Sequence, residues 1–140
     1  MYDARDGGGV MADNTDMELR DNCERIATKL RNLSYSQYYD TETGEYVSEI
    51  PDDCDDEERY EDLYTYVFED NCGIKIITSL DGKDLYGAEI CMAWGGPNIY
   101  INTRDAYIEG YWGSTEVKIP FSYDARDMIN DYIEELRGCY

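Results

Sequence analysis

Carboxylate side chains dominate one stretch of the chain and are its most distinctive chemical feature. Residues 40–70 contain fourteen Asp and Glu residues and one cation, Arg59, which gives them a net charge of −13 out of −20 for the whole chain. Such a charge density attracts basic surfaces, above all those that nucleic-acid-binding proteins turn toward phosphate, and it repels nucleic acid itself. The stretch therefore predicts a basic nucleic-acid-binding protein as the partner and no direct binding of nucleic acid.

Eight of these carboxylates fall within eleven residues, partly on a predicted helix. B-form DNA carries about one charge per 1.7 Å of its axis and a helix rises about 1.5 Å per residue, so this spacing approaches the charge density of DNA. We expect the eight side chains to imitate phosphates. They are Asp52, Asp53, Asp55, Asp56, Glu57, Glu58, Glu61 and Asp62. The plainer alternative is a solvated face that keeps the chain soluble, which charge runs usually are.

Recognised catalytic arrangements are absent from the sequence. The chain has no histidine, which excludes Ser-His-Asp, Cys-His and histidine-metal chemistry, and it has no Walker, dinucleotide-binding or G-x-S-x-G motif. The 32 acids are too many for spacing alone to pick out a glycosidase pair. The acidic stretch also lacks the ligand spacing of an EF-hand calcium loop. We therefore expect a protein that is not an enzyme and uses no cofactor or metal.

The five cysteines are scattered, and no two form a C-x-x-C pair; they are Cys23, Cys54, Cys72, Cys91 and Cys139. An odd number at wide spacings is typical of neither a disulfide framework nor a zinc site, and it is consistent with a reducing compartment. The sequence contains no apolar run of the roughly 20 residues that a membrane span needs and no signal-peptide pattern. We expect a soluble, cytoplasmic protein with no membrane contact.

Tyrosine is the second distinctive residue type. Fifteen tyrosines against two phenylalanines is an unusual ratio, and tyrosine is enriched where proteins meet other proteins. We expect Tyr107 and Tyr111, on one face of a predicted sheet, to contact the partner, although a second packed layer would explain them equally well. An acidic rim beside an aromatic face would suit a basic partner.

Three amphipathic helices are predicted to position these residues. The first covers residues 16–32, where apolar residues recur three and four positions apart. The second covers residues 55–69 and begins with Asp55 and Glu58, which have the spacing of a capping box. The third begins at Ser122 and continues almost to the end of the chain. Its apolar positions are Ala125, Met128, Ile129, Tyr132, Ile133 and Leu136.

Between the second and third helices, alternation with a period of two predicts an antiparallel meander. The strand candidates are residues 74–80, 85–94, 98–103 and 106–112, with a fifth edge strand at 117–119 that Pro120 closes. The residues expected on the face away from the core are Glu89, Tyr100, Asn102, Tyr107, Glu109 and Tyr111. A further hairpin is predicted over residues 35–47, around the polar turn at 40–45.

These elements predict an α+β fold, in which an antiparallel meander of four to five strands carries amphipathic helices on one face. At 140 residues the chain suits one domain, which we place at residues 17–140. Residues 1–16 show no periodicity and are expected to be flexible.

The C-terminal half resembles small acidic proteins of bacterial mobile elements. The resemblance lies in Ala-Trp-Gly-Gly-Pro-Asn-Ile-Tyr-Ile-Asn-Thr at 93–103, Glu-Gly-Tyr-Trp at 109–112 and a final helix that ends near a cysteine. In size, acidity and tyrosine content the chain also resembles the anti-restriction and anti-CRISPR inhibitors of phages and mobile elements.

The second resemblance implies a non-enzymatic inhibitor of a nucleic-acid-binding host defence protein, either a CRISPR effector or a restriction enzyme, in the cytoplasm of a bacterial host. Many such inhibitors resemble nucleic acid in charge and occupy the groove where it would bind. An immunity protein or antitoxin that blocks one cognate toxin is the alternative. Such a protein would depend more on shape and aromatic anchors than on charge.

Overall fold

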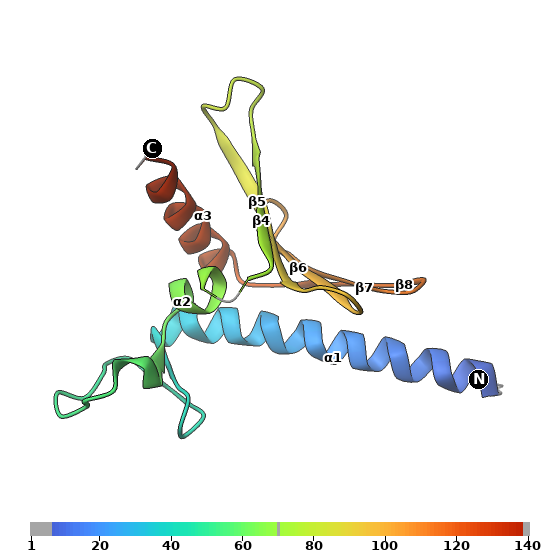
Figure 1. Ribbon diagram of the computed structural model, residues 1–140, viewed down its shortest axis with the longest axis horizontal. Coiled ribbons are helices and arrows are strands. Elements are labelled where there is room, and N and C mark those ends of the chain that lie inside the picture. The colour runs from blue at the N-terminus through green and yellow to red at the C-terminus, as the bar shows by residue number, and fades with distance from the viewer. Residues whose placement is uncertain (1–6, 70, 139–140) are drawn as a thin grey trace.

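The computed structural model describes residues 7–69 and 71–138 and shows an α+β fold with two antiparallel sheets (Figure 1). The larger sheet has the strand order β4-β5-β6-β7-β8. Its strands are β4 (Gly73–Thr78), β5 (Leu85–Ala93), β6 (Asn98–Asn102), β7 (Tyr107–Trp112) and β8 (Thr115–Pro120). All neighbouring strands are antiparallel, so the predicted meander is confirmed with its fifth strand.

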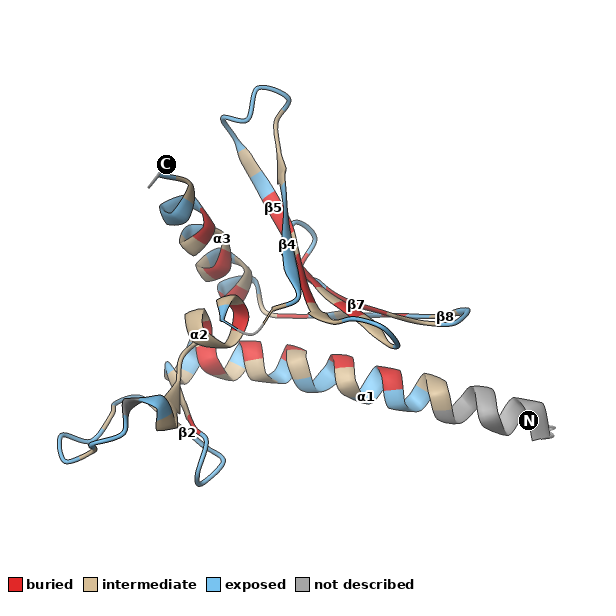
Figure 2. Ribbon diagram, viewed as in Figure 1, coloured by how far each residue is buried: buried red, intermediate tan, exposed pale blue. Residues whose placement is uncertain are grey.

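Helix α1 (Gly7–Ser36) lies along β7 and β8 and supplies one side of the core (Figures 1 and 2). Its buried residues recur three and four positions apart, as the sequence predicts, and they are Leu19, Cys23, Ala27, Leu30 and Leu33. Among the described residues, no helix combines the length and the apolar character that crossing a membrane requires.

The start of α1 differs from the prediction. The helix begins at Gly7, whereas apolar periodicity places its start near residue 16. Residues 7–9 are all glycine, which has low helix propensity, and no apolar stripe marks the first turns, so local pattern gave no signal there. The segment expected to be flexible is therefore helical over residues 7–16, and residues 1–6 lie outside those that the structure describes.

Helix α3 (Tyr123–Gly138) confirms the third predicted helix. Ser122 caps it, since Ser122 Oγ accepts a hydrogen bond from Ala125 N at 3.2 Å. A buried hydroxyl fixes the helix to the sheet, because Thr103 Oγ1 lies 2.7 Å from Asn130 Oδ1 and accepts from Ala88 N at 2.8 Å. The buried residues of α3 are Ala125, Ile129 and Ile133.

The second predicted helix, over residues 55–69, is wrong in its first half. This region contains a short 3-10 helix, η1 (Glu57–Arg59), a strand, β3 (Tyr60–Glu61), and only then α2 (Leu63–Phe68). The capping residue is Asp62, whose Oδ1 accepts from Thr65 N at 2.8 Å. Pairing of β3 with a distant strand overrides the local helical pattern.

That strand belongs to a second, three-stranded sheet of order β2-β1-β3. The predicted hairpin is confirmed as β1 (Tyr38–Asp40) and β2 (Glu45–Val47), and β1 also pairs with β3. Together with the connecting loop, these strands project from the C-terminal end of α1, on the side away from the five-stranded sheet (Figure 1). We call residues 38–61 the acidic arm.

Gly110 on β7 offers a test of how α1 packs on the sheet. A Cβ at this position would lie 2.7 Å from Cys23 Sγ and 2.9 Å from Leu19 Cδ1. Gly110→Ala should therefore overpack the core and lower the free energy of unfolding by about 1–3 kcal/mol in denaturant titrations.

Gly138→Ala is the matched control, since a Cβ at Gly138 meets nothing within 4 Å, and it should leave stability unchanged or slightly raised. Cys23→Ala should partly rescue Gly110→Ala, because it removes the clashing sulfur. If Gly110→Ala were as stable as the wild type, α1 would not pack on β7 in this way.

Candidate functional site

The most chemically distinctive surface is the acidic arm, and one ion pair closes it. Asp40 is only 4% exposed and receives two hydrogen bonds from Arg59, Nε to Oδ1 and Nη2 to Oδ2, each at 2.7 Å. The Arg59 guanidinium holds the pKa of the Asp40 carboxyl well below its usual range. Next to this ion pair, the backbone of the residues that follow β1 and precede β3 is also joined, since Thr41 N donates to Arg59 O at 2.9 Å. The single cation of residues 40–70 thus joins the hairpin to η1.

Two of the eight predicted contact residues have structural roles. Glu61 forms an ion pair with Lys29 of α1 at 2.6 Å, and the Lys29 ammonium lies over the rings of Tyr39 and Tyr66, at 4.5 and 4.3 Å from their centroids. Asp62 caps α2. These two carboxylates therefore anchor the arm to the helices and do not belong to one row with the others.

The remaining predicted carboxylates lie on the loop that forms the outer part of the arm. Asp52, Asp53, Asp55, Asp56 and Glu58 are all exposed, and none of them forms an ion pair within the part of the chain that the structure describes (Figure 2). We call these five residues the free carboxylates. The Glu57 side chain is outside the described residues.

The free carboxylates follow a loop and not the predicted helix. Cys54 N donates to Pro51 O at 3.1 Å, which closes a turn with Asp52 and Asp53 at its tip. Asp56 Oδ1 then accepts from Glu58 N at 3.1 Å and starts η1. The helical spacing that the sequence suggested is therefore wrong, although the residues stay close together along the chain.

Sequence reasoning missed three further exposed acids on the arm, Glu42 in the hairpin turn, Glu45 on β2 and Glu49 in the loop that follows. Pairing of Asp40 with Glu45 at the end of the hairpin brings Glu45 onto the arm beside the Asp40–Arg59 pair. The predicted hairpin could have placed Glu45 on this surface, because the register of its two strands decides which acids lie side by side.

The second predicted contact surface, the sheet face away from α1, is confirmed in its register. Asn102 lies opposite Tyr107 and Tyr100 opposite Glu109, so these residues share the face predicted for them. A Cβ at Gly110 would point toward α1, so the adjacent residues Glu109 and Tyr111 lie on the opposite face of the sheet.

At the centre of that face is a carboxylate, Glu109, only 9% exposed. Its Oε2 accepts from Asn102 Nδ2 at 3.1 Å, its Oε1 from Tyr111 OH at 3.5 Å, and Lys118 Nζ lies 4.0 Å away. Burial and the Glu109 charge raise the pKa of Tyr111. Tyr111 thus shields a buried carboxylate, whereas Tyr107 is exposed and lies beside Lys118, with the ammonium 5.9 Å from the ring centroid.

The two predicted contact surfaces do not adjoin. The acidic arm projects on the side of α1 away from the five-stranded sheet that carries Tyr107 and Tyr111 (Figure 1). An acidic rim beside an aromatic face, as the sequence suggested, is therefore wrong, and the arm has to be assessed as a surface of its own.

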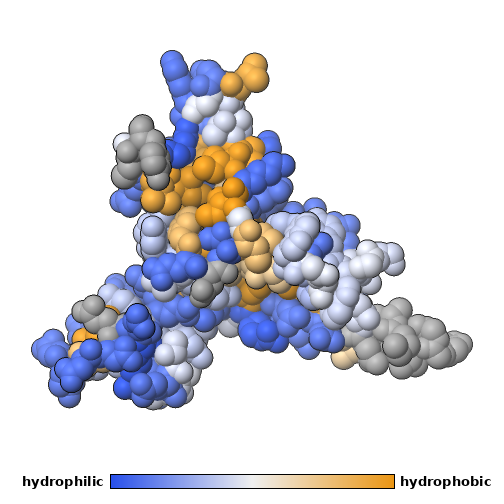
Figure 3. Space-filling view, in the orientation of Figure 1, coloured by the Kyte–Doolittle hydropathy of each residue, from blue (hydrophilic) through white to orange (hydrophobic). Residues whose placement is uncertain are grey.

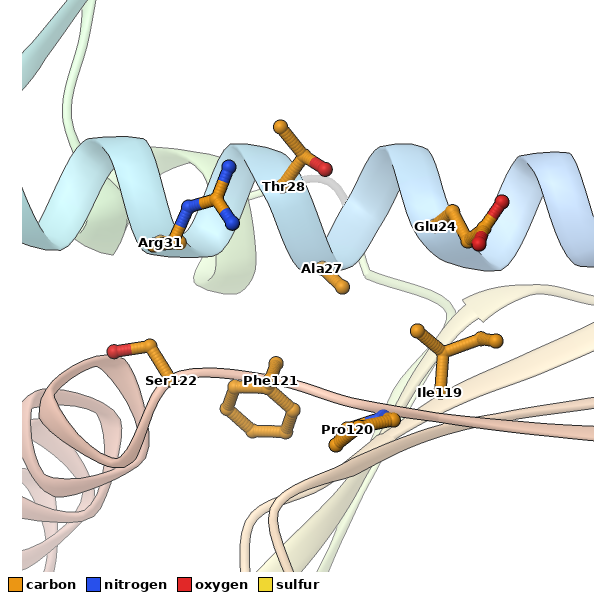
Figure 4. A pocket seen from close by; sticks show the side chains of 8 residues that line it. All are labelled: Glu24, Ala27, Thr28, Arg31, Ile119, Pro120, Phe121 and Ser122. Atoms are coloured by element: carbon orange, nitrogen blue, oxygen red, sulfur yellow. The ribbon is translucent and has the colours of Figure 1, made fainter.

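A groove of about 520 Å³ lies between α1 and the segment that leads from β8 into α3 (Figure 4). Its lining residues are Glu24, Ala27, Thr28, Arg31, Ile119, Pro120, Phe121 and Ser122. Ser122 Oγ is already engaged as the cap of α3, and the groove offers no cysteine and no second carboxylate to form an acid-base pair. These side chains do not make a recognisable catalytic set.

Four of the cysteines lie within the described residues, and all four are free thiols, whereas Cys139 is outside them. Burial beneath β7 raises the pKa of Cys23 to about 11, which keeps its thiol protonated and unreactive. Cys72 is exposed and adjoins buried Cys91, since Cys72 N donates to Cys91 O at 2.7 Å.

Comparisons with protein-family models, with curated proteins and with solved structures return no match for this chain. Its function must therefore be inferred from its own residues. Of the surfaces described above, the acidic arm concentrates the most unpaired charge.

The Asp40–Arg59 pair yields a prediction about pH. Since the pKa of Asp40 is lower in the folded arm than in the unfolded chain, the pair stabilises the arm above about pH 4, and this contribution is lost as pH falls through the folded value. Arg59→Gln should raise the pKa of Asp40 toward about 3.9, as measured by NMR titration of its carboxyl carbon.

Glu42→Gln is the control, because it removes only the longer contact of Arg59, at 3.5 Å from Glu42, and should shift the pKa of Asp40 much less. An ordinary Asp40 pKa in the wild-type protein would show that this pair does not close the arm.

Proposed function

We propose that the protein is a non-enzymatic inhibitor of a nucleic-acid-binding host defence protein, a CRISPR effector or a restriction enzyme, and that the acidic arm occupies the basic groove of that protein. The observation that carries this proposal is the set of free carboxylates, which are exposed, have no ion pair among the described residues and lie on a projecting loop. They imitate phosphates in charge and in accessibility.

The contrast between paired and unpaired acids supports the proposal. The two carboxylates that hold the arm in place each have a basic partner: Asp40 pairs with Arg59 and Glu61 pairs with Lys29. The free carboxylates have no such partner, and neighbouring like charges in an exposed loop repel one another. Asp56 accepts one hydrogen bond from Glu58 N, but the free carboxylates gain no counter-charge among the described residues, which is expected of groups that serve binding to another molecule.

The loop presents its charges in a different way from a helix. Asp52, Asp53, Asp55, Asp56 and Glu58 carry five charges within seven residues, which begin in a turn and lead into η1. The five charges are therefore gathered on one projecting loop, and they would suit a basic groove that binds a short run of phosphates.

Charge also predicts how binding responds to salt. Exposed carboxylates act over a Debye length of about 10 Å at 0.1 M salt and about 3 Å at 1 M, so association with a basic groove should slow steeply as salt rises. The free carboxylates would contribute mainly to the association rate, because long-range attraction steers the encounter.

The decisive test is cleavage of DNA by a panel of CRISPR effectors and restriction enzymes, with the protein added at low and high salt. The wild type should inhibit at least one enzyme in competition with its nucleic acid, and the inhibition should weaken with salt. A variant with Asn at the four arm aspartates 52, 53, 55 and 56 and Gln at Glu58 should lose inhibition by about tenfold or more, mainly through a slower association rate.

A matched control carries the same five charge removals elsewhere, at exposed acids of the helices and of the β6–β7 turn: Glu18, Asp21, Glu24, Asp105 and Asp131. It should retain most of the inhibition, because it keeps the arm intact. Equal loss in both variants would mean that net charge acts and not the arm. No loss in either, with Tyr107→Ala abolishing binding to a cognate toxin, would favour the immunity-protein alternative.

A further inference from the structure

The two edges of the five-stranded sheet differ in how they are protected. The β8 edge carries Glu116 and Lys118, ends at Pro120 and lies against α1, all of which oppose pairing with another strand. The β4 edge pairs only with β5, and among the described residues no strand lies on its outer side. Its outward amide and carbonyl groups are therefore available for pairing.

The β4 edge is also apolar on the face that belongs to the core. Ile74 and Ile76 lie opposite the buried Ile90 and Ala88, yet they are 39% and 45% exposed. Helix α3 contacts β5 and reaches the β4–β5 turn through Arg137, which donates to Gly82 O, but it leaves these isoleucines uncovered. Figure 3 shows an apolar patch over this part of the molecule, beside α3.

Charge indicates which partner suits this edge. Residues 73–103 contain two lysines and three acids, a net charge of −1, in contrast to −13 over residues 40–70. The lysine on β4, Lys75, lies opposite Glu89 in the ladder, which offsets its charge. This edge therefore has little to attract a basic protein, and it is a region where two copies of a strongly acidic chain can approach with little repulsion.

We propose that two copies of the chain associate through antiparallel pairing of their β4 strands, which joins two five-stranded sheets into one continuous sheet. The shift in register between Ile77 and Thr78 limits the regular part of the edge to residues 73–77. A two-fold axis at Ile76 would place Ile76 of each copy opposite Ile76 of the other, so that the two side chains cover each other, with Ile74 two residues along on the same face. This inference depends on β4 and does not involve the acidic arm.

Self-association through β4 should respond to salt in the opposite sense to binding by the arm. Each copy carries a net charge of −20, and screening of that repulsion by salt should favour the dimer. Sedimentation velocity of the full chain over a range of concentrations, at low and at high salt, should show a monomer–dimer equilibrium that shifts toward dimer as salt rises.

Ile76→Lys places a cation of each copy against the other and should weaken the dimer by about tenfold or more. Tyr35→Lys is the matched control, because Tyr35 is 90% exposed at the C-terminal end of α1 and does not belong to the β4 edge. This variant makes the same charge change and should leave association unchanged. Thermal unfolding of both variants should resemble that of the wild type, since Ile76 is half exposed.

Hydrogen exchange of the wild type provides a second measurement that needs no variant. Amides of β4 that point away from β5 should exchange more slowly at high protein concentration than at low concentration. A monomer at every concentration and salt, or a dimer that Ile76→Lys leaves unchanged, would overturn the proposal. Either result would leave the proposal for the arm standing, because that proposal rests on the free carboxylates and not on β4.

Discussion

A single guanidinium holds together the most highly charged part of this protein. Arg59 is the only cation in residues 40–70, and it binds both oxygens of buried Asp40 while its carbonyl accepts from Thr41 N. Without it, Lys29 of α1, which pairs with Glu61, would be the one counter-charge left to the fourteen carboxylates of this segment among the described residues. The pair joins the β1–β2 hairpin to η1, beside the backbone pairing of β1 with β3.

The acids of the arm, with Asp62 directly after it, therefore include two groups with different roles. Asp40, Glu61 and Asp62 hold the structure through an ion pair, an anchor on Lys29 and a helix cap. The free carboxylates of the loop form no ion pair among the described residues and remain open to solvent, although Asp56 also accepts from Glu58 N. The proposal that the arm binds a basic groove rests on this contrast between its unpaired carboxylates and the paired Asp40 and Glu61.

Local periodicity was sufficient to predict much of the fold. The third helix and all five strands of the meander follow from apolar spacing and turn residues, and the face carrying Glu109 follows from register. The helix over residues 55–69 was wrong because Asp55 and Asp62 are equally good caps in the sequence, and only pairing of Tyr60 with Asp40, twenty positions away, decides between them. For the same reason the sequence could not separate Glu61, which pairs with Lys29, from the exposed acids predicted beside it.

The central claim, that the acids of the arm divide into structural and free groups, is tested most directly by carbodiimide labelling of carboxylates in the folded protein, followed by peptide mass spectrometry. The account predicts fast labelling at Asp52, Asp53 and Asp55 and slow labelling at Asp40 and Glu61, which pair with Arg59 and Lys29. Uniform labelling rates across these five residues would contradict it.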